Sequence, residues 1–435
     1  MAQFRTDQNK LDFSNNKTRY EVFMLSDRLT PSGTTTDAFG RLRISQPFTL
    51  FDSSHRYNDN NLWAASNTAG GTYAFAANQS LINMNVSTAS GAEVVRETTK
   101  VFSYQPGKSL LIMNTFAMNE PKTNLRQRVG YFGAQNGVFL ENDGTTTYLV
   151  LRSYTSGSVV ETRVAQADWN HDKFDGTGYS AQGAQPEHST GLDITKTNIL
   201  WFDIEWLGVG DVRCGFVVDG TMKTAHVFHN DNRNTVPYMT TATLPLRYEI
   251  TNTGTTASSS NLKQICSTVI SEGGYELAGA QQAVGSAVTS PITLTTAGTL
   301  YNLVSLRLKS THLDAIAIIT AISLLTATNN AVVNWQVRAS ATTTGGTWVS
   351  AGTGSSIEYK LDNATVAGGR ILASGYTYST TQSAIPVTIL REALFKFQLE
   401  RDGLAGTPYE LTLCAVSDTL NTSVHASMDW DEVTR

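Results

Sequence analysis

The sequence predicts an all-β protein with an extended N-terminal arm and two β-sandwich domains. Short segments in which apolar and polar residues alternate recur along the chain, and turns rich in Gly, Ser and Thr separate them. Only 16 % of the residues are charged, well below the roughly one quarter that is usual. This leaves too few Glu, Lys and Arg residues to cover exposed helices. We expect an arm at residues 1–45, sandwiches at 46–277 and 291–435, and a linker at 278–290.

The arm has no core of its own. Polar residues dominate its first part, and residues 31–36 (PSGTTT) indicate a loop. Because exposed apolar side chains favour burial, we predict that the arm makes contacts between subunits. The alternative is that the arm adds a strand to its own sandwich. The apolar residues expected to make these contacts are Tyr20, Phe23, Leu25, Phe39 and Leu42.

The first sandwich shows its clearest strand at residues 202–206 (FDIEW), where apolar residues alternate with two acids. Alternation returns at 212–218, and Asp219-Gly220 predicts a hairpin with a return strand at 222–228. A second hairpin is expected at 101–113, around Gln105-Pro106-Gly107-Lys108. Pro245 places the strand at 244–250 on an edge, or marks where it starts.

Residues 278–290 are small and uncharged, which is typical of a linker or a loose entry strand. The alternating pattern then resumes at 333–340, at 395–400 and from Leu411. Many short strands with turns between them indicate a second sandwich or barrel. No repeat of 20–50 residues is visible, which argues against a solenoid or propeller.

The charge distribution excludes several classes of partner. The net charge is −5, and Lys and Arg are scattered, whereas a nucleic-acid-binding protein needs a basic surface. No apolar stretch reaches the roughly 20 residues that span a bilayer.

The N-terminus has no apolar signal-peptide core, so we expect assembly in a cytoplasm. The three cysteines, Cys214, Cys266 and Cys414, are far apart, and we expect buried, reduced thiols.

Asp203 and Glu205 are the candidate ligand-binding face. At positions i and i+2 of a strand they point to the same side, about 6.5–7 Å apart, a separation compatible with a pair of glycosidase carboxyls. Jelly-roll glycoside hydrolases place acids at alternate positions of a strand, but Trp201 stands where a third acid would be. We therefore expect a polar strand surface or a subunit contact, and no catalytic residue.

No metal or cofactor site is predicted. His226 and His229 are three residues apart, so on a strand they face opposite sides and share no metal unless a bulge or turn intervenes. The loop with His171, Asp172 and Asp175 is a candidate cation site, but it is expected instead to be a turn held by Asx hydrogen bonds. The tryptophans at 63, 201, 206, 335 and 348 are expected mainly in cores, although they could stack on sugars.

A set of short motifs resembles a family of virion structural proteins from tailed phages, especially marine and cyanobacterial ones. The resemblance spans about residues 20–278. The segment 201–228 also resembles the jelly roll of concanavalin-like lectin domains, so both sandwiches are expected to be jelly-roll-like. The motifs lie at residues 36–43 (TDAFGRLR), 46–53 (QPFTLFDS), 96–100 (RETTK), 104–109 (YQPGKS), 124–130 (NLRQRVG), 204–210 (IEWLGVG), 244–250 (LPLRYEI) and 271–275 (SEGGY).

This resemblance implies a structural component of the virion, exposed on the head, tail or baseplate, that acts by assembly and is not an enzyme. Its implied partners are other virion proteins and further copies of the chain, with a trimer favoured by analogy with phage fibres and decoration proteins. The alternative is a tail adhesin that binds a receptor or a host-surface glycan, with or without depolymerase activity.

Overall fold

The computed structural model describes residues 45–177, 191–276, 279–379 and 397–434. Within these ranges the regular secondary structure is β-strand apart from one short 3-10 helix at Gln166–Asp168, and this confirms the all-β prediction. No helix in the described ranges is long and apolar enough to cross a membrane. The arm residues Tyr20, Phe23, Leu25, Phe39 and Leu42 lie outside the described residues, so their role remains a prediction.

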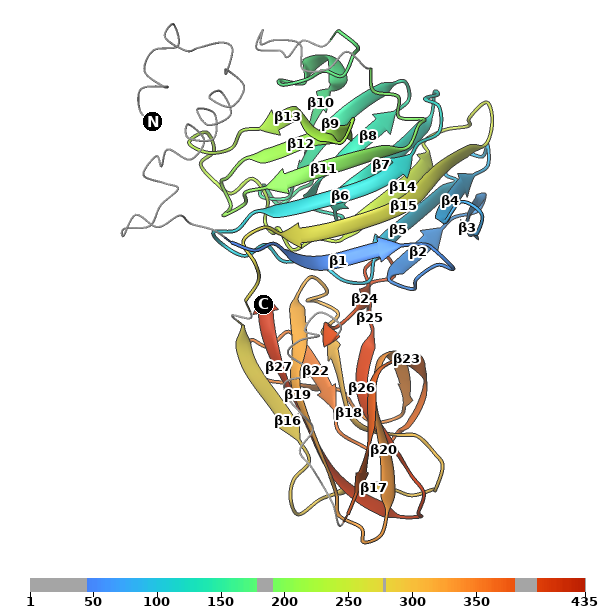
Figure 1. Ribbon diagram of the computed structural model, residues 1–435, viewed down its shortest axis with the longest axis vertical. Coiled ribbons are helices and arrows are strands. Elements are labelled where there is room, and N and C mark those ends of the chain that lie inside the picture. Colours follow the sequence, from blue (N-terminus) through green and yellow to red (C-terminus); the bar gives the residue numbers. More distant parts are fainter. Residues whose placement is uncertain (1–44, 178–190, 277–278, 380–396, 435) are drawn as a thin grey trace, which may run out of the picture. The chain divides into compact units, whose positions relative to one another are not determined.

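The N-terminal sandwich consists of two antiparallel sheets (Figure 1). The eight-stranded sheet has, in spatial order, β13 (Thr221–Phe228), β12 (Val212–Val218), β11 (Asn198–Ile204), β6 (Leu110–Ala117), β15 (Ser260–Ser271), β4 (Leu81–Val86) and β3 (Gly71–Ala76), and β1 (Phe48–Ser54) pairs with β15. The seven-stranded sheet has β10 (Val160–Ala165), β9 (Thr146–Ser153), β8 (Gly137–Asp143), β7 (Leu125–Phe132), β14 (Leu246–Asn252), β5 (Glu93–Thr98) and β2 (Trp63–Asn67).

The alternating pattern of the sequence decides which side chains fill the first core, the hydrophobic cluster of this sandwich. Leu200, Phe202 and Ile204 of β11 are completely buried there. Phe202 lies opposite Cys214 of β12, which is also completely buried. Alternate residues of a strand point to opposite faces, so Trp201 and Asp203 must point away from the first core.

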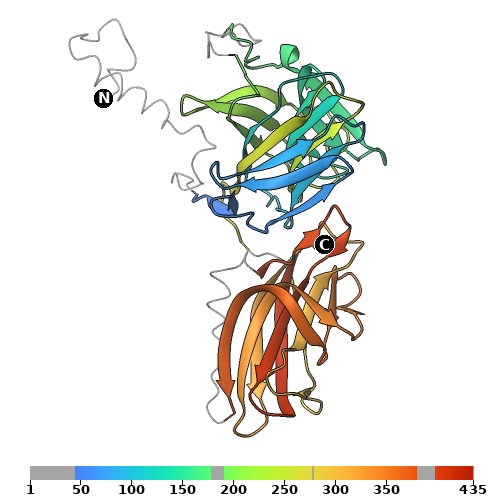
Figure 2. The same ribbon diagram turned by 90° about the vertical axis from the view of Figure 1, so that its right-hand side faces the viewer.

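The second set of strands encloses a separate hydrophobic cluster, the second core, with members from Ile292 to Trp430 (Figure 2). Both cores lie within the predicted sandwich ranges, while the domain boundaries remain a prediction. The four-stranded sheet has β16 (Ala280–Gly285), β27 (Thr422–Thr434), β17 (Ile292–Leu294) and β19 (Ile316–Thr326). The six-stranded sheet has β21 (Val349–Ser350), β22 (Ile357–Lys360), β18 (Tyr301–Leu308), β23 (Thr365–Tyr378), β20 (Val332–Thr344) and β26 (Glu410–Ser417), and β24 (Arg401–Asp402) pairs with β25 (Thr407–Pro408).

Residues 280–285 form β16, which pairs with β27, so of the two alternatives for residues 278–290 the entry strand applies to this part. Two local predictions need correction. The hairpin predicted at 101–113 is absent: residues 105–108 do turn, but β6 pairs with β11 and β15. The described residues 397–399 form no regular strand, although Phe397 and Leu399 are buried.

The predicted strand at 244–250 corresponds to β14, which starts just after Pro245. It lies inside the sheet, between β7 and β5, so the strand-start interpretation of Pro245 is confirmed and the edge interpretation is wrong. Cys214 and Cys414 are buried free thiols as expected, but the Cys266 residue is exposed.

The outer face of the seven-stranded sheet is closed by an arginine lattice. This lattice consists of five arginines and five acids that form cross-strand ion pairs over Phe132 and Phe139, both completely buried. Gly130 is required beneath it, because a Cβ there would lie 2.6 Å from Phe139. The members are Arg126, Arg128, Arg152, Arg163, Arg247, Glu97, Glu141, Asp143, Glu161 and Glu249.

Arg128 is the centre of the arginine lattice. Its Nε lies 2.6 Å from Glu141 Oε2, and its Nη1 lies 3.4 Å from Glu249 Oε1. Burial opposes the ionisation of Glu249, but the arginines around it, chiefly Arg247 and Arg128, outweigh this effect and hold its pKa below the ordinary value. The buried Glu249 carboxylate therefore depends on these guanidinium groups for compensation.

We predict that Arg128→Met destabilises the protein by about 3–5 kcal/mol, because it leaves the buried Glu141 and Glu249 carboxylates undercompensated. The measurement is chemical denaturation. Arg128→Met combined with Glu141→Met should recover part of this loss, since the double change removes one of the stranded charges. The exposed Arg56 provides the control, and Arg56→Met should change stability by less than about 0.5 kcal/mol. Equal effects of Arg128→Met and Arg56→Met would contradict the role of the lattice.

Candidate functional site

The candidate site lies where β11, β12 and β13 end, on the face turned away from the first core. Asp203 of β11 is directly opposite Arg213 of β12. The loop between these strands begins with Glu205 and ends with Asp211, and the backbone N–H of Glu205 donates to the Asp211 carbonyl at 3.1 Å. Residues separated by a turn are thereby brought to one end of the sheet.

These residues line a pocket of about 620 Å³. Its walls carry acids, bases, hydroxyl groups and one aromatic ring. The lining residues are Tyr104, Gly107, Lys108, Ser109, His171, Asp203, Glu205, Leu207, Asp211, Arg213, Val227 and His229. The sequence-predicted pair, Asp203 and Glu205, therefore does share one site, together with basic residues that the sequence analysis did not select.

Asp203 differs from the expected exposed acid, because it is only 7 % exposed. It forms an ion pair with Arg213, whose side chain is 59 % exposed. Burial raises the pKa of Asp203 above its ordinary value, and although Arg213 opposes this, Glu272 and Glu205 raise the pKa further. Glu205 lies beyond the end of β11 and is exposed. The two carboxyls therefore occupy different environments in one pocket, which the i, i+2 spacing alone does not reveal.

Tyr104 provides the aromatic wall of the pocket. Its ring packs edge-on against Trp206, with ring centroids 6.0 Å apart and planes at 77°. Tyr104 and Lys108 flank the turn at 105–108, in which Lys108 N donates to the Gln105 carbonyl at 3.1 Å. The sequence signal for this turn is correct, but no local sequence pattern predicts that the turn lies beside the end of β11.

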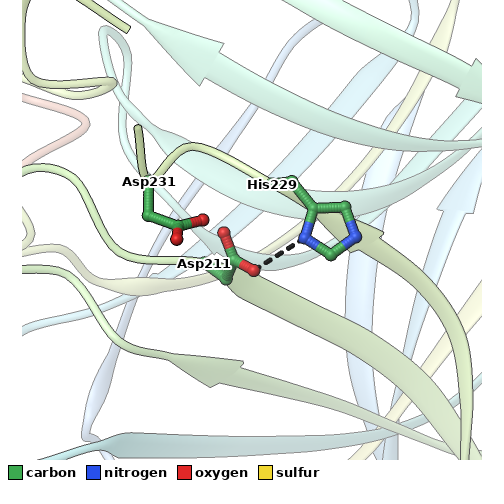
Figure 3. A group of neighbouring side chains, drawn as sticks. All are labelled: Asp211, His229 and Asp231. Carbon is green, nitrogen blue, oxygen red and sulfur yellow. Dashed lines mark hydrogen bonds and ion pairs between the residues drawn. The ribbon is translucent and has the colours of Figure 1, made fainter. Parts of the chain in front are cut away.

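Asp211, His229 and Asp231 form a cluster at the edge of the pocket (Figure 3). Their ligand-type atoms all lie within 4.8 Å of one another. His229 Nδ1 is 2.7 Å from Asp211 Oδ2, and Asn230 N donates to Asp211 Oδ1 at 2.9 Å. One imidazole and two carboxylates are a donor set that could hold a divalent ion such as Zn²⁺ or Mn²⁺.

His226 is separate from this cluster, as the strand spacing predicted. It lies within β13 and is only 7 % exposed, whereas His229 follows the end of the strand. Asn170 N donates to His226 Nδ1 at 3.3 Å. Asp211, in the loop before β12, takes the position next to His229 and Asp231.

The loop around His171 and Asp172 contains the predicted Asx turns, whereas only two of the five tryptophans named above belong to a core. Asp172 Oδ1 accepts a hydrogen bond from Phe174 N at 2.8 Å, and Asp175 Oδ1 accepts one from Thr177 N at 2.9 Å, so both form Asx turns. Trp63 and Trp335 belong to the two cores. Trp201 is 4 % exposed and lies against Gly215, where a Cβ would approach its ring to 2.5 Å. Trp206 and Trp348 are half-buried.

No family model matches this chain. No curated protein matches it either. Solved structures do match, among them a carbohydrate esterase from the Shiga toxin-encoding bacteriophage phi24B, at 10 % identity, a TM-score of 0.31 and coverage of 52 % of this chain and 99 % of that one. The carbohydrate recognition domain of Emp47p matches at 11 % identity and a TM-score of 0.32, with 54 % and 99 % coverage. A mixed-linkage glucan GH16 protein of Bacteroides ovatus matches at 9 % identity and a TM-score of 0.33, and the match covers 51 % of this chain and 99 % of that one.

The titles of these structures name a carbohydrate esterase, a carbohydrate recognition domain and a GH16 protein, and the virion family remains a resemblance. They contradict our prediction that the protein is not an enzyme, because several are titled as an esterase or as glucanases, and we withdraw that prediction. At these identities and TM-scores the titles assign no ligand or reaction to this chain.

We predict that protein freed of metal with EDTA binds Mn²⁺ or Zn²⁺ through the cluster of Asp211, His229 and Asp231, and that Asp231→Asn weakens this binding at least tenfold. The physical reason is the loss of one of two anionic ligands. The measurement is isothermal titration calorimetry. Asp193→Asn, which changes another exposed acid held in an Asx turn, is the control. If both variants titrate like the wild type, the cluster is not a cation site.

We predict that the protein loses stability as the pH falls from about 6.5 to 4. Burial lowers the pKa of both His55 and His226 from 6.5 to about 4. Above pH 6.5 both histidines are neutral in the folded and unfolded states, but below it the unfolded chain binds protons that the folded chain resists. By pH 4 each histidine should have removed roughly 3 kcal/mol of stability.

The measurement is the melting temperature between pH 7.5 and 4 for the wild type, His55→Asn and the control His312→Asn, which alters an exposed histidine. Below pH 6.5 the melting temperature should fall less steeply with decreasing pH in His55→Asn than in the wild type, and His312→Asn should behave like the wild type. An unchanged slope in His55→Asn would show that this buried histidine does not resist protonation in the fold.

Proposed function

We propose that the protein is a carbohydrate-binding component of a tailed-phage particle and that the pocket at the ends of β11 to β13 binds the glycan. The observation that carries this proposal is the pocket itself. Asp203, Glu205, Arg213 and Lys108 present oppositely charged groups around one cavity. Carboxylate and guanidinium groups can form paired hydrogen bonds with neighbouring hydroxyls, which is what a sugar offers.

The scaffold of the pocket favours recognition of a small polar ligand. Asp203 and Arg213 are held on adjacent paired strands, and strands position side chains more precisely than loops do. Tyr104 adds an aromatic surface with a polar end. Most of its lining side chains are polar or charged, which suits a ligand rich in hydroxyl groups.

The virion setting of this proposal is supported by the string of motifs between residues 36 and 275 that resembles phage structural proteins. In this setting the chain assembles with other virion proteins, as a trimer joined through the arm, and presents the pocket to a host-surface glycan. Mass spectrometry of purified particles, together with light scattering of the isolated protein, tests this setting independently of glycan binding.

We predict that the protein binds oligosaccharides on a glycan array and that Arg213→Ala weakens binding at least tenfold, because it removes an exposed hydrogen-bond donor and leaves Asp203 unpaired. Asp203→Asn should have a similar effect. Arg233→Ala is the matched control, since Arg233 is an exposed arginine outside the pocket lining. The absence of binding to every glycan, or equal binding by Arg213→Ala and Arg233→Ala, would reject the pocket as a glycan site.

A second candidate function is cleavage of the bound glycan. The observation that favours it is the difference between the two carboxyls, since the pKa of buried Asp203 is raised while Glu205 is exposed in the same pocket. Acid and base roles in glycoside hydrolysis require two carboxyls in different environments. New reducing ends, formed from a bound glycan by the wild type but not by Glu205→Gln, would establish this activity.

A further inference from the structure

Three large apolar side chains are exposed in two loops beside the pocket. Leu207 is 56 % exposed, Val209 is 47 % exposed and Val236 is 55 % exposed. We call these three residues the apolar rim. Leu207 also lines the pocket, so the rim continues directly into the proposed glycan site. Single exposed apolar residues are ordinary, but a group of them next to a polar pocket points to a ligand.

The two loops of the apolar rim are joined to each other. Tyr238 N donates to the Gly208 carbonyl at 3.0 Å, and a Cβ on Gly208 would lie 3.4 Å from Pro237. Within the first loop, Val209 N and Gly210 N both donate to the Trp206 carbonyl at 2.8 Å. Trp206 in turn packs against the first core. The rim is therefore held in place by backbone hydrogen bonds and by a packed aromatic ring.

Leu207 takes a strained backbone conformation in the turn that Val209 N and Gly210 N close onto the Trp206 carbonyl. Its φ is +38°, in the left-handed region that large side chains avoid. Among the described non-glycine residues with positive φ, only Leu207 and Phe174 have large apolar side chains. Phe174 is 2 % exposed, so core packing compensates its strain, whereas the side chain of Leu207 packs into no core. Uncompensated strain of this kind is typical of functional positions.

We infer that the apolar rim binds a small hydrophobic substituent, such as the methyl of an O-acetyl group, on the glycan held in the pocket. This inference rests on the proposed function. Three side chains are far too few for a protein interface, which buries about 800 Å² on each partner. The remainder of the ligand must then occupy the adjoining polar pocket, which requires one molecule with a polar body and a small apolar group.

The test uses an array in which every O-acetylated oligosaccharide is paired with the same compound after mild alkaline deacetylation. The wild type should bind acetylated members roughly tenfold more tightly than their partners, the usual order for one apolar group in a pocket. Val236→Ser should remove this preference and leave binding to the deacetylated members unchanged. Val160→Ser is the matched control, because Val160 is 52 % exposed on β10 of the other sheet.

Leu207→Asn separates function from folding. Asparagine tolerates positive φ, so the melting temperature should stay the same or rise, while the preference for acetylated glycans disappears. If the wild type binds both members of each pair equally, or if Val236→Ser weakens both members alike, the inference is wrong while glycan binding stands. If no glycan binds at all, the inference and the proposed function fail together.

Discussion

In β11, Leu200, Phe202 and Ile204 are completely buried in the first core, and this packing determines where the neighbouring side chains point. A strand has a period of two, so Asp203 must lie on the opposite face. A shift of register by one residue would place its carboxyl in the core, at a cost far above the value of any one contact. The hydrophobic packing beneath the site therefore determines its geometry, and its charged residues need only pair with one another.

This dependence explains how much the sequence predicts. The alternating segments and Asp219-Gly220 correctly predict β12, β13 and the turn that joins them, because these signals are local. The predicted hairpin at 101–113 is wrong because the partners of β6 come from strands some 90 and 150 residues later in the sequence. Asp203 is buried because Arg213 lies opposite it, and Lys108 and Tyr104 reach the pocket only through such long-range pairing. No local pattern contains this information.

The arginine lattice shows the same limit for electrostatics. Only 16 % of the residues are charged, yet ten charged residues are concentrated on one face of the seven-stranded sheet. Each strand by itself shows only alternating charges, such as Arg126 and Arg128 on β7. The cross-strand partners of Arg128, Glu141 and Glu249, become visible only once β8 and β14 are placed beside β7. The contribution of the arginine lattice to stability depends on all of its members, because a single buried charge without its partner is destabilising.

The two halves of the candidate site are built in different ways. Asp203 and Arg213 are fixed by strands whose core-facing neighbours are completely buried, so their positions are set by the stability of the fold. Leu207 and Val236 are fixed by loop hydrogen bonds, and Leu207 keeps a conformation that its own packing does not justify. The strands hold the polar pocket rigidly, and the loops hold the apolar rim beside it. This arrangement is expected when the strand residues provide affinity and the loop residues discriminate among related ligands. The loops can therefore change in sequence without loss of the fold, whereas the core-facing strand residues Leu200, Phe202 and Ile204 cannot.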